Sequence, residues 1–486
     1  MKMSLDLFFV SYYYYYFLLF ISLLLISILF NKKSTKNKPP TPPALPIIGH
    51  LHLINKPLHK SLKDLSDRYG PVLLLRLGTQ SVLALSSLSS IEECLTKNDV
   101  IFANRPPLVA AKHLGYNYKS VEWSPYGPNW INLRRVMNMY MFSSSSLQTT
   151  SNIRNEEVQY TMHQLYQRSL SSSSLDIFHE VDLKSIGKTY NGDKKWNFDS
   201  LIRECFLPKT LVHTVDFLPV LQWIDYQGTE KKLKQVRKNK DAFLDELIQE
   251  YLKSSGRADN DVDERKTEHK SLIEVLMSLQ QDEPETYIHE VVKGILGAVF
   301  MAGIETSRAT MVAAISLLVK NPEALTKLRD EIDFHVGEGR FISDSDLPKL
   351  PYLQCVIQES LRLHPPAPIP APHISSQDCT IAGYHIPRGT MLLLNAWAIQ
   401  RDPKCVMKEG KMDGFRWIPF GAGRRGCPGS GMAFRVTSLA IGGLIQCLEW
   451  KKVEDSDKII EEEGDEPSSR AMCRPRSVKK NILSQI

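Results

Sequence analysis

The sequence lacks three features that would divide or cross-link it. No glycine- or serine-rich linker separates its 486 residues into comparable halves, which indicates one large domain rather than two. Its eight cysteines form no CxxC pair and follow no regular spacing, so neither a disulfide framework nor a zinc site is indicated. The absence of an internal repeat excludes a repeat architecture.

Strong charge of either sign is also absent. The net charge of +6 is mild for this length. It is too weak to indicate binding to nucleic acid, and it fits an anionic membrane surface or an acidic protein partner. A hydrophobic content of 43% is ordinary for a globular protein.

The N-terminus contains an uncharged stretch of 24 residues, Leu7 to Phe30. As a helix it would be roughly 36 Å long, enough to span a hydrocarbon layer of about 30 Å. A cleaved signal peptide is the alternative, but the length of the stretch and the lack of a small-x-small site before Asn31 favour an anchor. Several lysines follow at once, and this bias predicts a cytosolic catalytic domain: Lys32, Lys33, Lys36 and Lys38.

We therefore divide the chain into a membrane anchor (1–30), a basic and proline-rich hinge (31–50) and a catalytic domain (51–486). Prolines restrict their own backbone and that of the preceding residue. The run Pro39–Pro46 is accordingly expected to form a semi-rigid spacer between membrane and domain.

Hydrophobic periodicity predicts a mainly α-helical domain with small β-sheets. A helix is expected over Leu58–Tyr69, followed by two short strands within 72–86. From Ile91 onward most segments carry helical periodicity. Residues 380–399 indicate a β-hairpin with its turn at Pro387–Gly389.

Two later helices carry polar residues that need explanation. The longest, Pro284–Lys320, is apolar on most faces, yet its centre contains Gly303, Glu305 and Thr306. A buried carboxylate is costly without partners or water. The second helix, Pro351–Leu363, carries Glu359 and Arg362, which are three residues apart and hence on one face.

The residues around Cys427 form the most specific pattern in the chain. Cys427 lies among glycines, after two arginines and before an apolar helical stretch. This arrangement predicts a loop that presents one thiolate to a metal, because the thiolate is the ligand form of cysteine. A structural cysteine is the alternative.

Taken in order, the AGxET-S, ExxR and FxxGxRxCxG patterns resemble those of cytochrome P-450, a family of haem-thiolate monooxygenases. The resemblance covers nearly the whole chain, and segments such as NAWAIQRDP and IPFGAGRRGCPGSGMA are similar to the plant branch that includes isoflavone 2'-hydroxylases. It implies the cytochrome P-450 fold, with a large helical haem domain and an N-terminal transmembrane helix.

The resemblance implies haem b as cofactor, with the Cys427 thiolate as axial iron ligand. Gly423 and Gly429 would allow close backbone approach to the sulfur, and Phe420 would shield it from water. The remaining haem contacts that the resemblance implies are donors to the propionates, although Trp130 is alternatively a core aromatic: Trp130, Arg134, Arg425 and His373.

On the oxygen side, Gly303 would leave room for a diatomic ligand, and Glu305 and Thr306 would relay protons. The alternative for Thr306 is a hydroxyl bonded to its own helix. Glu359 and Arg362 resemble a buried pair that stabilises the haem-binding core, whereas read alone they indicate a solvated salt bridge.

Three segments depart from the family pattern. The usual Pro-Glu-Arg-Phe motif is missing within 404–418, where only Arg416 remains as a substitute, a helix is shortened near 187–191, and the apolar C-terminal hairpin is missing at 455–470. These losses suggest a haem-deficient inactive paralogue or a misjoined gene model as one alternative. A haem-thiolate isomerase or dehydratase, which needs no reductase, is another.

The leading hypothesis is a single-pass protein of the endoplasmic reticulum membrane that hydroxylates a small hydrophobic aromatic, flavonoid- or isoflavonoid-like substrate. It would use O2 and electrons from NADPH–cytochrome P-450 reductase. The substrate would contact apolar stretches that are poor in charge: Arg105–Val121, the helix containing Val299 and Ala302, and Ala367–Pro370.

Overall fold

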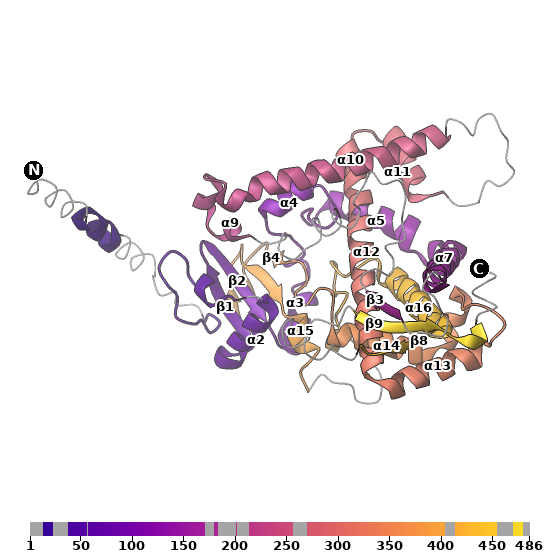
Figure 1. Ribbon diagram of the computed structural model, residues 1–486. Coiled ribbons are helices and arrows are strands. Elements are labelled where there is room, and N and C mark those ends of the chain that lie inside the picture. Colours follow the sequence, from indigo (N-terminus) through magenta and orange to yellow (C-terminus); the bar gives the residue numbers. More distant parts are fainter. Residues whose placement is uncertain are drawn as a thin grey trace, which may run out of the picture.

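The computed structural model describes residues 13–22, 37–55, 57–170, 179–182, 201, 213–255, 270–403, 414–453 and 470–479. Most of these residues are helical, and the strands form three small sheets (Figure 1). The predicted mainly α-helical fold with small sheets is confirmed. The α-helices are α2 (Leu58–Tyr69), α3 (Leu88–Leu95), α4 (Val109–Leu114), α5 (Pro128–Met137), α6 (Ser144–Thr149), α7 (Ser151–Leu170), α9 (Thr214–Phe217), α10 (Thr229–Ser255), α11 (Leu272–Asp282), α12 (His289–Lys320), α13 (Pro322–Val336), α14 (Pro351–Leu363), α15 (Ala396–Ile399) and α16 (Ser430–Cys447).

Helix α12 runs through the middle of the molecule, and α10 crosses it near one end (Figure 1). It ends at Lys320 as predicted, but it begins at His289 rather than Pro284. The reason for the later start is a turn in which the Tyr287 amide donates to the Glu283 carbonyl, followed by Ile288 in an extended conformation. The apolar residues of α12 pack with α7, α13, α14 and α16 in the largest core cluster.

By length and composition alone, α12 is apolar enough to cross a membrane, and it is the one described helix that meets this test. Its most apolar window is 44% buried within the protein. Since a central core helix passes the same test, its composition reflects burial in the domain.

The largest sheet lies beside this helical core, with strand order β1-β2-β7-β4. Strands β1 (Val72–Leu77) and β2 (Gln80–Leu85) confirm the two strands predicted within 72–86, and they pair antiparallel. Strand β7 (Met391–Leu394) then pairs in parallel with β2, and β4 (His373–Ile374) pairs with β7. All four residues of β7 are buried, which explains why its sequence is uniformly apolar.

The predicted hairpin turn at Pro387–Gly389 is wrong. The hairpin joins β5 (Cys379–Ile381) to β6 (Tyr384–Ile386) through Ala382 and Gly383, both of which have positive φ. Such a pair is the usual two-residue hairpin connection. Residues 387–389 instead lead from β6 into β7 of the larger sheet.

A strand pair is present near the C-terminus, on either side of the segment 455–470 in which the apolar hairpin is expected to be missing. Strand β8 (Leu448–Lys451) pairs with β9 (Arg470–Pro475), and β3 (His179–Asp182) adds to β9. The alternating burial of β9 is typical of a half-buried strand. The segment between these strands lies outside the described residues, as do residues 187–191 and 404–413.

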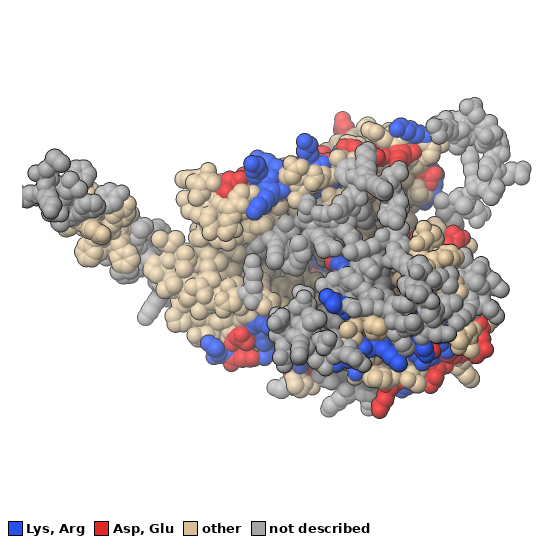
Figure 2. Space-filling model, in the orientation of Figure 1, with Lys and Arg blue, Asp and Glu red and all other residues tan. Residues whose placement is uncertain are grey.

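The described N-terminal residues show two different environments. Residues 13–22 are helical with almost all side chains exposed, including Tyr13 and Phe20. In contrast, the end of the predicted hinge is bonded to the edge of β1: the Leu74 amide donates to Pro40, and the His50 amide donates to Arg76. Figure 2 shows Lys and Arg interspersed with Asp and Glu over one face, in keeping with the mild net charge.

Candidate functional site

The Cys427 loop is closed by its own backbone. The Cys427 amide donates to the Phe420 carbonyl at 2.8 Å, and the Gly426 amide donates to the Gly423 carbonyl at 3.0 Å. Gly421 and Gly423 have φ values of 66° and 67°, a conformation that favours glycine. Helix α16 begins directly after the loop, at Ser430.

Contacts with a distant part of the chain fix this loop. A Cβ atom on Gly423 would lie 2.5 Å from Asp99 Oδ1 and 3.1 Å from the Leu95 carbonyl oxygen, so a larger residue would require Asp99 to move. Asp99 also accepts a hydrogen bond from the Arg424 amide at 3.1 Å. The loop is therefore held against the region that follows α3.

The Cys427 thiol is accessible to solvent, but the loop surrounds it closely. Desolvation raises the pKa of this thiol, whereas the Gly429 amide and the positive charge of Arg134 lower it. A Cβ atom on Gly429 would lie 3.9 Å from the sulfur. Phe420 packs with Trp417 and Phe434, at centroid distances of 6.0 and 5.6 Å.

Three buried or half-buried arginines gather beside the loop. Arg134 donates to the Gly426 carbonyl at 2.8 Å. Arg425 donates to the carbonyls of Ala103 and Ser124 at 2.6 and 2.5 Å. Sequence reasoning missed the third as an anion-binding group: Arg105 donates to the carbonyls of Glu122, Ala371 and Pro372.

These arginines carry an electrostatic cost. Burial, together with the charges of Arg105 and Arg134, lowers the pKa of Arg425 to about 9. Burial also lowers the pKa of Arg105 to about 10. Within the described part of the chain none of the three forms an ion pair with a carboxylate, and their hydrogen bonds go to neutral carbonyl groups. The charge of the buried Glu122 acts on Arg105 and raises its pKa in part.

Trp130 and His373 lie beside the arginines, and each forms a hydrogen bond with a backbone carbonyl group. The Trp130 indole donates to the Val121 carbonyl at 3.1 Å, and Arg425 stacks 4.4 Å from its ring. This geometry is the one that the core-aromatic alternative describes. His373 Nδ1 bonds to the Phe102 carbonyl at 2.7 Å, and burial together with Arg105 and Arg425 holds the pKa of His373 well below its usual value.

The centre of α12 has an open face. Ala302 and Gly303 are exposed, although residues 291–297 of the same helix are buried, as are residues 312–316. A Cβ atom on Gly303 would meet no atom within 4 Å. The Thr306 hydroxyl donates to the Ala302 carbonyl at 2.6 Å, and Glu305 is paired with Arg308.

Glu359 and Arg362 form a two-pronged pair on α14, but the pair is not fully buried, contrary to expectation. Arg362 Nε donates to Glu359 Oε2 at 2.7 Å, and its Nη1 donates to the Gln400 carbonyl at 2.9 Å. The Glu359 side chain is 41% exposed and that of Arg362 is 16% exposed. In the described ranges no ion pair joins the exposed Arg416 to Glu359, so the outer side of the carboxylate remains open to water.

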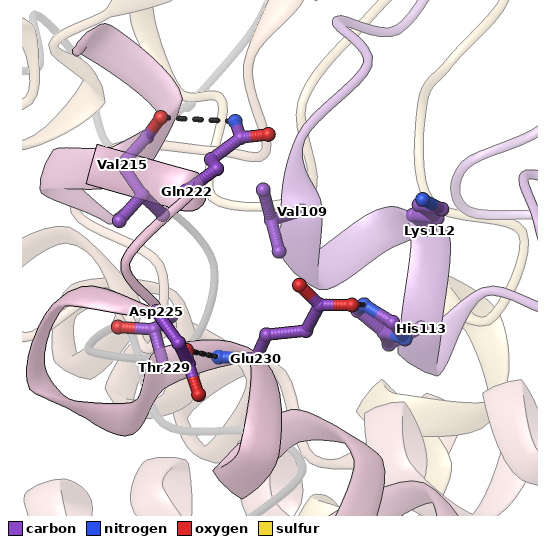
Figure 3. Close-up of a pocket in the computed structure, with 8 residues that line it drawn as sticks. All are labelled: Val109, Lys112, His113, Val215, Gln222, Asp225, Thr229 and Glu230. Carbon is purple, nitrogen blue, oxygen red and sulfur yellow. Dashed lines mark hydrogen bonds and ion pairs between the residues drawn. The ribbon is translucent and has the colours of Figure 1, made fainter. Parts of the chain in front are cut away.

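A small cavity of about 40 Å³ lies elsewhere, between α4, α9 and the start of α10 (Figure 3). His113 and Glu230 face each other across it, with Nε2 and Oε1 3.5 Å apart. Three of its lining residues, Val109, Lys112 and His113, belong to the stretch 105–121 that was expected to contact substrate, whereas none of the predicted haem-binding or proton-relay residues lines it. Its volume suits a few water molecules, so it is distinct from the open face of α12.

Comparison with known protein families matches residues 39–476 to the cytochrome P450 family. The chain belongs to this family. It is 42% identical over 481 residues to cytochrome P450 81Q32 of Catharanthus roseus, covering 93% of this chain and 94% of that protein. It is 37% identical to isoflavone 2'-hydroxylase of Glycyrrhiza echinata, again covering 93% and 94%. A zebrafish cytochrome P450 solved with progesterone has a TM-score of 0.63 at 25% identity, over 82% of this chain and 94% of that chain.

Membership identifies this chain as an oxidoreductase of the P450 monooxygenase type, a class that uses haem with an axial cysteine thiolate. The described residues fit this group. Arg134 and Arg425 are desolvated cations that form no ion pair with a carboxylate in the described ranges, and Arg105 is offset only by the charge of the buried Glu122. The two propionates of haem would supply further negative charge. The accessible Cys427 sulfur and the open face of α12 match the need for one ligand and for space.

Proposed function

We propose that this cytochrome P450 hydroxylates a small aromatic, flavonoid- or isoflavonoid-like substrate. One oxygen atom of O2 would enter a C–H bond of the substrate, and the other would leave as water with two protons and two electrons. NADPH–cytochrome P450 reductase is the proposed electron donor. The observation that carries the proposal is the closed loop around Cys427 beside three arginines, none of which forms an ion pair with a carboxylate in the described ranges.

We assign the haem contacts to residues of this chain. Cys427 would hold the iron, while Arg134, Arg425 and Arg105 would bind the propionates, with neutral His373 and Trp130 packed beside them. When bound, haem supplies the activation of oxygen. Gly423, Gly429 and Phe420 would keep the sulfur in a fixed and sheltered position.

On the other side, Gly303 would leave space beside α12. Glu305 and Thr306 would move protons at their carboxylate and hydroxyl oxygens. The substrate would lie against the apolar stretches 105–121, 299–302 and 367–370. Isoflavone hydroxylation is the activity in the name of one relative, and it supports an aromatic substrate for this chain.

Membrane attachment is part of the proposal. We expect residues 1–30 to form a single anchor in the endoplasmic reticulum membrane, with the 51–486 domain in the cytosol. The exposed apolar side chains of the helical residues 13–22 support this placement. Exposed basic groups near the Cys427 loop, including Arg135 and Arg424, would face an acidic redox partner.

The deciding experiment is a carbon monoxide difference spectrum of the reduced, full-length chain. A Soret band shifted in the manner of a thiolate-ligated haem is expected for the wild type and should be lost in Cys427→Ser. Absence of haem absorbance in the wild type would instead favour the haem-deficient alternative. Hydroxylation of isoflavones should then depend on added reductase and NADPH, because an isomerase or dehydratase would need neither.

A further inference from the structure

Arg308 on α12 binds the carboxylate of Glu305, the residue that we propose relays protons. Arg308 Nε donates to Glu305 Oε2 at 3.0 Å, and Arg308 Nη2 donates to Glu305 Oε1. The two side chains are only 17% and 23% exposed, respectively. Both carboxylate oxygens are thus bound to one guanidinium, and such two-pronged charged contacts are among the stronger hydrogen bonds in proteins.

The pair also turns the carboxylate away from the open face of the helix. Successive residues of an α-helix are rotated by about 100°. Thr306 therefore lies about 40° from Ala302 around the axis, on the open side, whereas Arg308 lies about 120° from Ala302 in the other direction. Glu305 is between them, and its contact with Arg308 draws its oxygen atoms away from Thr306.

The hydroxyl and the carbonyl of Thr306 are also hydrogen-bonded within α12. Its hydroxyl donates to the Ala302 carbonyl at 2.6 Å, and its own carbonyl accepts from Thr310 at 2.8 Å. No hydrogen bond connects the Glu305 carboxylate with the Thr306 hydroxyl among the residues that the structure describes. The two groups assigned to proton movement are therefore separated in this conformation.

We infer that Arg308 is a positioning residue that holds Glu305 in a closed, proton-withholding arrangement. The inference rests on the proposed function of Glu305. For Glu305 to take a proton from water and pass it toward Thr306, an oxygen of its carboxylate must first leave Arg308. Removing the guanidinium shifts the population toward the free carboxylate, and for a partly exposed ion pair the shift is roughly two- to fivefold.

The first test measures the accessibility of Glu305 and requires no haem. Carboxyl-specific labelling followed by peptide mass spectrometry is applied to the full chain and to Arg308→Gln. Labelling of Glu305 should rise roughly two- to fivefold in the variant, while that of Glu290 on the same helix stays constant. The matched control is Lys63→Gln, which breaks the ion pair between Lys63 and Asp67 on α2 and should leave Glu305 unchanged. Equal labelling of Glu305 in both chains would overturn the inference.

The second test measures how electrons are used. With reductase, product formed per NADPH consumed should rise in Arg308→Gln, and release of hydrogen peroxide should fall. Arg308→Lys should lie between wild type and Arg308→Gln, because lysine keeps the charge but loses the planar two-pronged contact. In a Glu305→Gln background the Arg308 substitution should have no further effect.

An Arg308→Gln effect of equal size in that background, or a fall in product per NADPH, would contradict the inference. These outcomes differ from failure of the proposed function itself. A wild-type chain without the thiolate-type carbon monoxide band would refute the haem proposal, whereas the labelling comparison would still decide whether Arg308 holds Glu305.

Discussion

The Cys427 loop and the centre of α12 are built from contacts of opposite range. The loop depends on residues far away in sequence: Asp99 accepts from Arg424, and Ala103 accepts from Arg425. On α12, in contrast, Thr306 bonds to Ala302 and Glu305 to Arg308, all within four residues. Local bonds can change without unfolding the protein, so the first region suits a fixed ligand and the second a moving proton.

Among substitutions that test this contrast, we expect the largest loss of stability at Gly423. In Gly423→Ala the left-handed backbone and the approach to Asp99 both become unfavourable, and together they should lower the free energy of unfolding by roughly 3 kcal/mol. Denaturant unfolding measures this loss, and the thiolate-type carbon monoxide band should fall with it. Gly383→Ala is the matched control, because Gly383 has a φ of 79° in the two-residue turn between β5 and β6 but nothing within 4 Å of its Cβ position; it should cost only about 1–2 kcal/mol. Equal losses in the two variants would show that Asp99 does not restrict the loop.

A smaller effect is expected from His373, next to the arginines. Its pKa is held well below the ordinary value, so the unfolded chain binds more protons once the pH falls below about 6.5. The stability that His373 contributes is therefore present above this pH and is lost as the pH decreases, by up to about 1.4 kcal/mol per pH unit. His373→Gln should remove that part of the slope in pH-dependent unfolding, whereas His335→Gln, at an exposed position, should not.

Bound haem sharpens this expectation. The propionates would offset the charges of Arg105 and Arg425, which contribute to the low pKa of His373. The slope should therefore be shallower with haem than without it. A slope that is identical in the two forms would argue against propionates at this position.

The smallest effect on stability is expected on α12. Thr306→Val removes a hydroxyl that bonds only to its own helix, so the free energy of unfolding should change by less than about 0.5 kcal/mol. Product formed per NADPH consumed should nevertheless fall. Thr310→Val removes a similar bond from a buried hydroxyl. It should lower the free energy of unfolding by about 1 kcal/mol and leave the product formed per NADPH unchanged. A large loss of stability in Thr306→Val would contradict the view that the bonds at the centre of α12 can change without unfolding the protein.

The sequence predicts the elements better than their partners. Helices α2 and α14 have the expected bounds, because their periodicity and flanking glycine or proline are local signals. The predicted position of the hairpin turn, Pro387–Gly389, is wrong, because the pairing of β7 with β2 is a long-range contact that no local pattern records. The same reason explains why the β8–β9 pair was not expected.

The candidate site divides in the same way. The glycines around Cys427 are visible in the sequence because they are fixed by backbone conformation. Arg105, in contrast, lies between an asparagine and two prolines and carries no sign that it will join Arg134 and Arg425. The role of Arg308 depends on a side-chain rotamer, which a sequence pattern does not specify.

The distance along the chain between the Cys427 loop and its support has a consequence for biosynthesis. The hydrogen bond from Arg424 to Asp99 spans 325 residues. During synthesis the Asp99 region leaves the ribosome first and can fold early, but it cannot hold the loop until the last part of the chain is made. Contacts of such long range form slowly. The nascent protein must therefore be made to nearly its whole length before its thiol has a fixed position, and a truncation before the loop loses both the ligand and helix α16 of the core.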